Sequence, residues 1–229
     1  MSRTHFKLVA AVALFLLVLP VVAQNQMAGK LSAVKGKVSL VRGQSMPVPL
    51  HNGDNIQSGD AIWTDAMSSA TLRFPDRSTV RIFPNSHVEL RPESSSWKEF
   101  LHLLLGNVRV QIEKLSGRPN PKVMTTPTAI IAVRGTIFAV AVERNGDTQV
   151  GLEKGVVAVA SQFHPEEEVL LHPGQELWVR HGEALGQPRR MQRPMPGLAA
   201  PNSSGFGQMG PRGSGANRPT GTGRQGPSR

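Results

Sequence analysis

The sequence predicts an all-β fold: one antiparallel β domain, arranged as a roll, a sandwich or a solenoid-like stack of strands, with a disordered C-terminal tail. Short runs of alternating apolar and polar residues recur from Leu31 to Val179, which is the period of a half-buried strand. Turn-forming Gly, Asp, Asn and Pro separate these runs. From Gln187 onward the chain is rich in Gly, Pro and Arg and has no apolar period, so residues 187–229 are predicted to be disordered.

The first segment has the features of a secretory signal peptide. Arg3 and Lys7 precede an apolar run over residues 8–22, and small residues lead up to Ala23. A basic start, a short apolar run and a small-residue exit are typical of a cleaved signal, whereas a membrane span usually needs about twenty apolar residues. We therefore expect residues 1–23 to be removed, which leaves no stable membrane span and a periplasmic or extracellular chain. The alternative is that the run is retained as an anchor.

Charge and cysteine content exclude several classes of protein. The chain has no cysteine, which excludes a disulfide framework. Its net charge is +10, but nine of the 26 cationic residues lie in the signal segment and the tail. The region between them carries seventeen cations against sixteen acids, so its charge does not indicate nucleic-acid binding. The arginines of the tail can contact anionic surfaces through charge.

The β domain is expected over residues 30–179, and two local turns are predicted within its second half. An Asn145-Gly146 pair between alternating runs is the strongest short hairpin signal, and Lys154-Gly155 then turns that strand into "VVAVAS". A further hairpin is expected where "PDR" at 75–77 lies between the strands "SATLRF" and "STVRIF". In the first strands, the candidate inward positions are Leu31, Ala33, Val38 and Leu40, with a register break near Gly36.

One segment also fits a helix. "SSSWKEFLHLLLG" (94–106) begins with a serine that could cap a helix and has apolar residues on one helical face. We expect at most a short turn there, followed by a strand through Leu103–Leu105 that continues past Gly106.

Two blocks of the sequence resemble the FecR family of bacterial periplasmic domains. "LHNGDNIQSGDAIWTDAMSSATLRFPDRSTVRIFPNSHVEL" (50–90) is similar to the opening block of the family, with its Gly59-Asp60 pair and the turn at Asp76. "TPTAIIAVRGTIFAVAV" (126–142), followed by "TQVGLEKGVVAVA", resembles its most specific block. The resemblance extends from about Gly36 to Gly174 and implies a sensory or binding domain.

Two departures limit what the resemblance implies. The family usually has Gly where this chain has Arg77, so the hairpin there is expected to be strained or of another turn type. Regulatory members carry a cytoplasmic anti-sigma segment of many tens of residues before their membrane span, where this sequence has Met1 to Lys7. The sigma-regulating activity is therefore not implied for this chain.

Arg134 and Gly135 interrupt the most apolar part of the sequence. A guanidinium can clamp a carboxylate or a sugar acid through paired hydrogen bonds. Alternatively, Gly135 relieves the backbone at a bend while Arg134 reaches buried carbonyls or an acid such as Asp60 or Asp76. We favour the second interpretation, in which Arg134, Gly135 and Thr136 hold a β-corner together, with Gly59, Asp60 and Asp76 as further structural residues.

No catalytic constellation is present in the sequence. There is no cysteine nucleophile, no Gly-x-Ser-x-Gly motif, and no glycine pattern for phosphates or dinucleotides. The segment from His164 to His172 contains three glutamates, but its spacing does not define a metal site. We expect neither a cofactor nor a metal, and we expect Asp60 and Asp76 to bond their own turns.

These observations predict a non-enzymatic binding or sensory module. Trp63, Trp97 and Trp178 could form a surface that stacks on sugars, although tryptophan more often fills a core; Arg134, Trp63 and Trp178 are the candidate ligand contacts. The expected partner is an envelope protein or a glycan. The alternative is a membrane-anchored envelope regulator that works with a separate anti-sigma partner.

Overall fold

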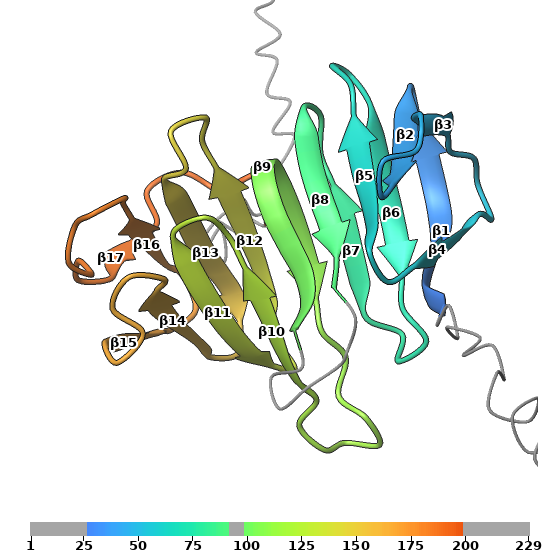
Figure 1. Ribbon diagram of the computed structural model, residues 1–229. Coiled ribbons are helices and arrows are strands. Elements are labelled where there is room, and N and C mark those ends of the chain that lie inside the picture. Colours follow the sequence, from blue (N-terminus) through green and yellow to red (C-terminus); the bar gives the residue numbers. More distant parts are fainter. Residues whose placement is uncertain (1–26, 92–98, 199–229) are drawn as a thin grey trace, which may run out of the picture.

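Two β-sheets packed face to face make up the described part of the protein. The computed structural model describes residues 27–91 and 99–198, and these contain strands and no helix. In both sheets the N-terminal strands lie at one end of the molecule and the C-terminal strands at the other, as the colours of Figure 1 show. The predicted all-β antiparallel fold is confirmed, and of the three arrangements the structure is a sandwich.

Nine strand segments form each sheet, and one long strand belongs to both. Sheet A, in its spatial order, comprises β4 (Asn55–Gln57), β1 (Met27–Lys35), β6 (Ser69–Arg73), β7 (Thr79–Ile82), the second half of β9 (Glu99–Gln111), β12 (Ile137–Val142), β13 (Thr148–Lys154), β16 (Gln175–Val179) and β17 (Arg189–Arg190). Sheet B comprises β3 (Val48–Pro49), β2 (Val38–Arg42), β5 (Asp60–Thr64), β8 (Ser86–Leu90), the first half of β9, β10 (Pro121–Thr125), β11 (Ala129–Arg134), β14 (Val157–Ser161) and β15 (Glu168–Leu171).

All neighbouring strands are antiparallel except β9 and β10. Alternate residues of each strand face the space between the sheets, where one apolar core contains Leu72, Val88, Leu103, Phe138 and Leu152, all fully buried. The period-two pattern of the sequence therefore predicted which side chains are buried in most strands. The opposite side chains form the two outer faces of the sandwich.

Every described passage from one sheet to the other contains a residue with positive φ. These residues are Gly36, Gly53, Gly59, Met67, Asn85, Gly106, Ser116, Gly117, Gly135, Gly155 and Gly174. Gly106 marks the point at which β9 leaves sheet B for sheet A, with φ of 90°. A Cβ atom there would lie 2.6 Å from the carbonyl oxygen of Asn85 and from Cα of Ser86, so only glycine fits.

Buried hydroxyl groups join the two sheets near the second block of the sequence. Oγ1 of Thr148 lies 2.8 Å from Oγ1 of Thr126 and from Oγ1 of Thr128, and all three side chains are buried. Oγ1 of Thr128 also lies 3.1 Å from the carbonyl oxygen of Val179. The Thr-Pro-Thr turn between β10 and β11 in sheet B is thereby tied to β13 and β16 in sheet A.

The local predictions are largely confirmed. Both hairpins form, β12 with β13 and β6 with β7. Arg77 has a φ of 68°, which is the left-handed conformation that glycine adopts most readily. The strand through Leu103–Leu105 continues past Gly106 as β9. The turn expected before it falls on residues 92–98, outside the described part of the chain.

One inward position in β1 is wrong. Ala33 is exposed, while Leu31 is buried and Val34 packs against the core. The pairing of β1 with β6 shifts between Leu31 and Ala33. Such a β-bulge adds one residue and reverses the side of every residue after it, which the alternation of the sequence alone does not reveal.

The beginning of the predicted tail packs on sheet A. Residues 189–190 form β17 beside β16, and Met191, Met195 and Leu198 are buried against Ala139 on the outer face. A Cβ atom on Gly151 would lie 2.6 Å from Sδ of Met195, so the two methionines fill the space that this glycine leaves. The predicted disorder from Gln187 is therefore corrected for residues 187–198, and residues 199–229 lie outside the described part.

Met195→Ala should destabilise the protein by about 2–4 kcal/mol, because it empties a buried apolar site over Gly151. Met46→Ala is the matched control, since Met46 is 86% exposed and should change stability by less than about 0.5 kcal/mol. Urea unfolding of both variants measures the difference. Equal urea midpoints for the two variants would show that the packing of residues 191–198 on sheet A does not stabilise the protein.

Candidate functional site

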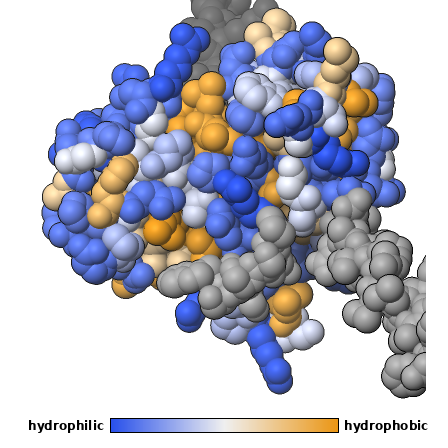
Figure 2. All heavy atoms as spheres, viewed as in Figure 1, coloured by the Kyte–Doolittle hydropathy of each residue, from blue (hydrophilic) through white to orange (hydrophobic). Residues whose placement is uncertain are grey.

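Polar side chains interrupt the outer face of sheet B at its centre. Cross-strand pairing places one residue from each neighbouring strand in a single row: Val41, Ala61, Glu89, His102, Thr125 and Ile130. Apolar or small residues stand at both ends of this row, with charged and polar ones between them. Figure 2, which views this face, shows apolar side chains over β9 and over β11 and β14, with hydrophilic side chains between.

Three of the central side chains are linked by short hydrogen bonds. The hydroxyl of Thr125 donates to Oε1 of Glu99 at 2.6 Å, and Nδ1 of His102 lies 2.6 Å from the same hydroxyl oxygen. A hydroxyl has one proton, and Glu99 accepts it. We therefore assign the proton of the imidazole to Nδ1, which donates to Thr125, so Nε2 of His102 is left as a hydrogen-bond acceptor.

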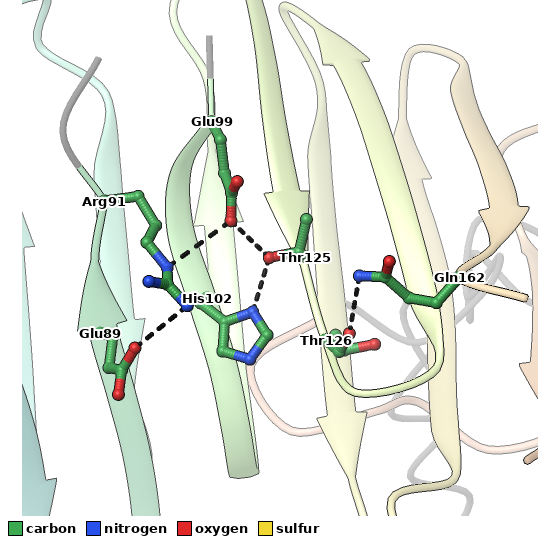
Figure 3. Close-up of polar contacts among 7 residues, drawn as sticks. All are labelled: Glu89, Arg91, Glu99, His102, Thr125, Thr126 and Gln162. Atoms are coloured by element: carbon green, nitrogen blue, oxygen red, sulfur yellow. Dashed lines mark hydrogen bonds and ion pairs between the residues drawn. The ribbon is translucent and has the colours of Figure 1, made fainter. Parts of the chain in front are cut away.

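Arg91 connects the two carboxylates of the site. Its Nη2 lies 3.3 Å from Oε2 of Glu89, and its Nε lies 3.8 Å from Oε1 of Glu99. Figure 3 shows Arg91 between Glu89 and Glu99, with His102 and Thr125 beside them. The side chains of Glu89 and Glu99 are 32% exposed and that of Arg91 is 45% exposed, so a ligand on this face can reach all three.

Both histidines on this face have a lowered pKa. Burial lowers the pKa of His102, and the nearby charge of Arg91 lowers it further, against the opposite effect of Glu89 and Glu99. Burial also lowers the pKa of His87, assisted by His102 and opposed by Glu89. Burial therefore favours the uncharged form of both rings, and the described residues of the site include two carboxylates and one guanidinium.

An exposed aromatic pair borders this network. Trp63 on β5 and His87 on β8 are directly paired across the strands, and their rings stack with centroids 3.7 Å apart. Trp63 remains 44% exposed. Beside it lies a hollow of about 340 Å³, whose lining includes Gly59, Ala61, Trp63, His87, Glu89 and Arg91. The small side chain of Ala61 leaves room for this hollow between taller neighbours.

The hydrogen-bond order differs from that of a hydrolase triad. In a triad the carboxylate orients the histidine, and the histidine takes the proton of the nucleophile. Here Glu99 accepts the proton of Thr125 directly, and His102 donates to the hydroxyl oxygen. The lone pair that would attack a substrate is thus engaged, so this arrangement holds the threonine in place and offers hydrogen-bonding groups to a ligand.

The predicted tryptophan surface is not formed by the two tryptophans that the structure describes. Trp63 is on the outer face of sheet B, while Trp178 on β16 pairs with Gln149 on the outer face of sheet A. The two rings are therefore on opposite sides of the sandwich. Trp97 lies outside the described residues.

Arg134 is exposed and forms no hydrogen bond or ion pair with the described residues. The buried partner expected for it is absent because Asp60 pairs with Arg42 and Asp76 with Lys122. Arg134 ends β11, and its side chain points outward where the chain turns into sheet A. The interpretation of Arg134 as a tethered corner cation is corrected.

Gly135 and Thr136 do form a corner between β11 and β12. Gly135 has a φ of 72°, which a β-branched residue adopts only at a cost. The methyl of Thr136 would lie 2.7 Å from a Cβ atom on Gly155, so two corners of the sandwich pack against each other there. Oγ1 of Thr136 is buried without a hydrogen-bond partner among the described residues.

Asp60 is fully buried at the start of β5. It accepts hydrogen bonds from Nε of Arg42 at 2.6 Å, from Nη2 of Arg42 at 2.8 Å and from the backbone of Gln57 at 2.8 Å. The amide of Gly59 donates to the carbonyl oxygen of Leu90 at 2.7 Å, which holds this corner against β8. The Gly59-Asp60 pair thus fixes the floor of the hollow.

Asp76 lies at the other end of the domain, in the β6–β7 hairpin. It accepts hydrogen bonds from the backbone of Ser78 at 2.9 Å and from Nδ2 of Asn120 at 2.7 Å, and Nζ of Lys122 is 3.3 Å away. Burial alone would raise the pKa of Asp76, but the hydrogen bonds and the charge of Lys122 outweigh it and lower the pKa.

The histidines of the 164–172 segment are not gathered into a metal site. His164 lies 3.5 Å from Glu166 on the exposed surface, and His172 donates its backbone amide to Gln175. No group of three or more possible ligands lies close enough to hold a metal ion in the described ranges.

Sequence analysis missed the central residues of this face. Glu89, Glu99 and Thr125 are spaced along strands as ordinary outward positions and Arg91 directly follows a strand, so nothing in their spacing shows that they meet. One signal was available in the sequence. The segments "HVELR" (87–91) and "EFLHL" (99–103) carry charged residues at outward positions, and they lie on either side of one loop.

The match to a family model decides the relationship. Residues 60–158 match the model described as FecR protein. The chain contains a FecR domain. Trp63, His87, Glu89, Arg91, Glu99, His102 and Thr125 all fall inside the matched residues, so the polar network and the aromatic pair belong to this domain.

Two crystal structures of a Parabacteroides distasonis ATCC 8503 protein, provisionally described as an anti-sigma factor, are similar in structure. Each has a TM-score of 0.46 and 16% sequence identity, covering 57% of this chain and 59% of that protein. The chain thus spans about three fifths of the length of its structural neighbour. No curated protein is significantly similar in sequence.

Gly135→Val should lower the free energy of unfolding by about 1–3 kcal/mol, because valine is strained at positive φ. Arg134→Ala should unfold with the parent, since Arg134 is exposed and has no partner among residues 27–91 and 99–198. Thr136→Val keeps the packing against Gly155 and removes an unbonded hydroxyl, so it should not be destabilising. Thermal unfolding of the three variants tests the corner, and a large loss in Arg134→Ala would contradict it.

The free energy of unfolding of Asp76→Asn should change less with pH in the acid range than that of the parent. A lowered folded pKa contributes stability above the unfolded pKa of about 3.9, and this contribution is lost as the pH falls through the folded value. The variant should therefore be less stable than the parent at pH 7, with a difference that narrows below about pH 4. Urea unfolding across pH measures it, with exposed Glu167→Gln as control; a constant difference would contradict the pKa shift.

Proposed function

We propose that the chain is a non-enzymatic binding module that works outside the cytoplasm in the bacterial envelope and takes its ligand on the outer face of sheet B. The observation that carries the proposal is the group of Glu89, Arg91, Glu99, His102 and Thr125 beside the exposed Trp63. Partly burying charged side chains costs free energy. The packing of this sandwich comes from the apolar core between the sheets and not from these charges.

The comparison between the two ionic groups supports this assignment. The Asp60–Arg42 pair binds a backbone amide and closes a corner of the fold. The Glu89–Arg91–Glu99 group lies outside the core, makes longer ion pairs and is about one third to one half exposed. The first group therefore serves the fold, and the second is free to serve a ligand.

The FecR domain supports a role in envelope signalling. Two interpretations follow, depending on whether the apolar segment over residues 8–22 is cleaved or retained. A cleaved segment gives a free sensory or binding module. A retained segment gives a membrane-anchored regulator that works with a separate anti-sigma partner. In residues 27–91 and 99–198 no helix is long and apolar enough to cross a membrane.

The state of the N-terminus distinguishes these two interpretations. We expect intact-mass spectrometry of the protein, expressed with a C-terminal tag in a diderm bacterium and fractionated, to show a chain that begins at Gln24 in the periplasmic or extracellular fraction. A chain that retains Met1 in the membrane fraction would instead support the anchored regulator.

Binding on the proposed face is tested by sedimentation with isolated envelope fragments of the source bacterium. Wild-type protein should sediment with the fragments, and Arg91→Ala should reduce this binding by about tenfold, because it leaves Glu89 and Glu99 without their shared cation. Arg134→Ala, which removes an exposed arginine elsewhere, should bind like the wild type. If Arg91→Ala binds as strongly as Arg134→Ala, the outer face of sheet B does not take part in binding.

A further inference from the structure

The hollow beside Trp63 and His87 has the composition of a site for one ring of a small molecule. Its volume of about 340 Å³ is at the lower end of the range for ligand pockets, about 300–1,000 Å³. Its floor is Ala61 and one side is the Trp63–His87 pair, with Glu89 and Arg91 at the other end. An apolar ring wall therefore faces charged hydrogen-bonding groups across a short distance.

This combination matches the two kinds of surface that a sugar ring presents. The C–H groups of a pyranose carry partial positive charge and pack on the negative face of an aromatic ring. Its hydroxyl groups each donate and accept, and carboxylate and guanidinium pairs bind neighbouring hydroxyls at once. Trp63 supplies the first contact, and Glu89 with Arg91 supplies the second.

The charges of the described side chains at and beside this hollow disfavour acidic ligands. Glu89 and Glu99 share one cation, Arg91, so an added carboxylate or phosphate would meet an excess negative charge. The two histidines do not compensate, because burial favours the uncharged form of both. A ligand without negative charge meets no such opposition.

The row across sheet B extends the site beyond one ring. Glu89 is paired with His102 on the next strand, and His102 with Thr125 on the strand after it. The acceptor Nε2 of His102 has no partner among the described residues. A second sugar ring next to the hollow would therefore find a hydrogen-bond acceptor at the position where its hydroxyls lie.

We propose that the outer face of sheet B binds a neutral oligosaccharide, with one ring packed against Trp63 in the hollow and the next ring over His102. This inference rests on the proposed binding function and names its ligand class. Trp63, which is stacked on His87, is assigned the contact with the apolar side of the first ring, Glu89 and Arg91 the hydroxyls of that ring, and His102 a hydroxyl of the second.

Isothermal titration calorimetry with defined oligosaccharides tests the proposal on the protein as it is purified from the fraction that contains it. The probes are cellotetraose, maltotetraose and tetra-N-acetylchitotetraose, with oligogalacturonate as the acidic comparison. At least one neutral probe should bind at millimolar concentration or below, and the acidic probe should bind at least about tenfold more weakly.

Trp63→Ala should weaken binding of the neutral probe by about tenfold or more. His102→Ala should weaken binding of the tetrasaccharide more than binding of its own monosaccharide unit, which is titrated as a further probe. Trp178→Ala is the matched control, because it removes a half-buried tryptophan from the opposite face and should leave the affinity unchanged. Circular dichroism of the variants confirms that each retains the β fold.

Three outcomes would overturn the proposal: binding of none of the neutral probes, equal losses in Trp63→Ala and Trp178→Ala, or preference for the acidic probe. Sedimentation with envelope fragments separates this failure from that of the proposed function. If wild-type protein sediments with the envelope in a manner that depends on Arg91 but binds no neutral oligosaccharide, the ligand class is wrong and the binding function stands. If it does neither, both are wrong.

Discussion

The positive-φ bend of the chain at each described passage between the two sheets is the constraint on which the rest of the structure depends. A strand that leaves one layer must enter the facing layer within a few residues, and each described passage does so through positive φ. At Gly106 a close approach to Ser86 adds to this requirement. Because these corners hold the two layers in register, the core between them is continuous and does not depend on the central side chains of the outer face of sheet B.

The outer faces of the two sheets differ in how much of each the chain itself covers. The outer face of sheet A is covered in part by the chain itself, because Met191 and Met195 fill the space over Gly151. The outer face of sheet B has no such cover from the described residues at its centre, where the aromatic pair and the ionic group are exposed. The proposed binding surface on sheet B would therefore leave the packing of the sandwich unchanged.

Several residues that stand out in the sequence stabilise the fold, while the residues of the candidate site have no distinctive sequence pattern. Asp60 and the Thr126–Thr128 turn satisfy buried groups at corners and between layers. Arg134, the most conspicuous cation, lies in solvent. Glu89, Arg91 and Glu99 have no local signature, because β8 and β9 place them together only after a loop closes and the register is set.

The sequence by itself determined the all-β class, both hairpins and most core positions, because alternation and turn residues act over a few neighbours. It also determined that Gly135 lies at a bend. Only the tertiary structure decided that strands alternate between two layers, that a bulge turns Ala33 outward, and that residues 187–198 return to sheet A. The same holds for the row from Ala61 to Thr125, since cross-strand register depends on contacts between segments far apart in the chain. Local patterns specify elements, and long-range pairing specifies which side chains meet.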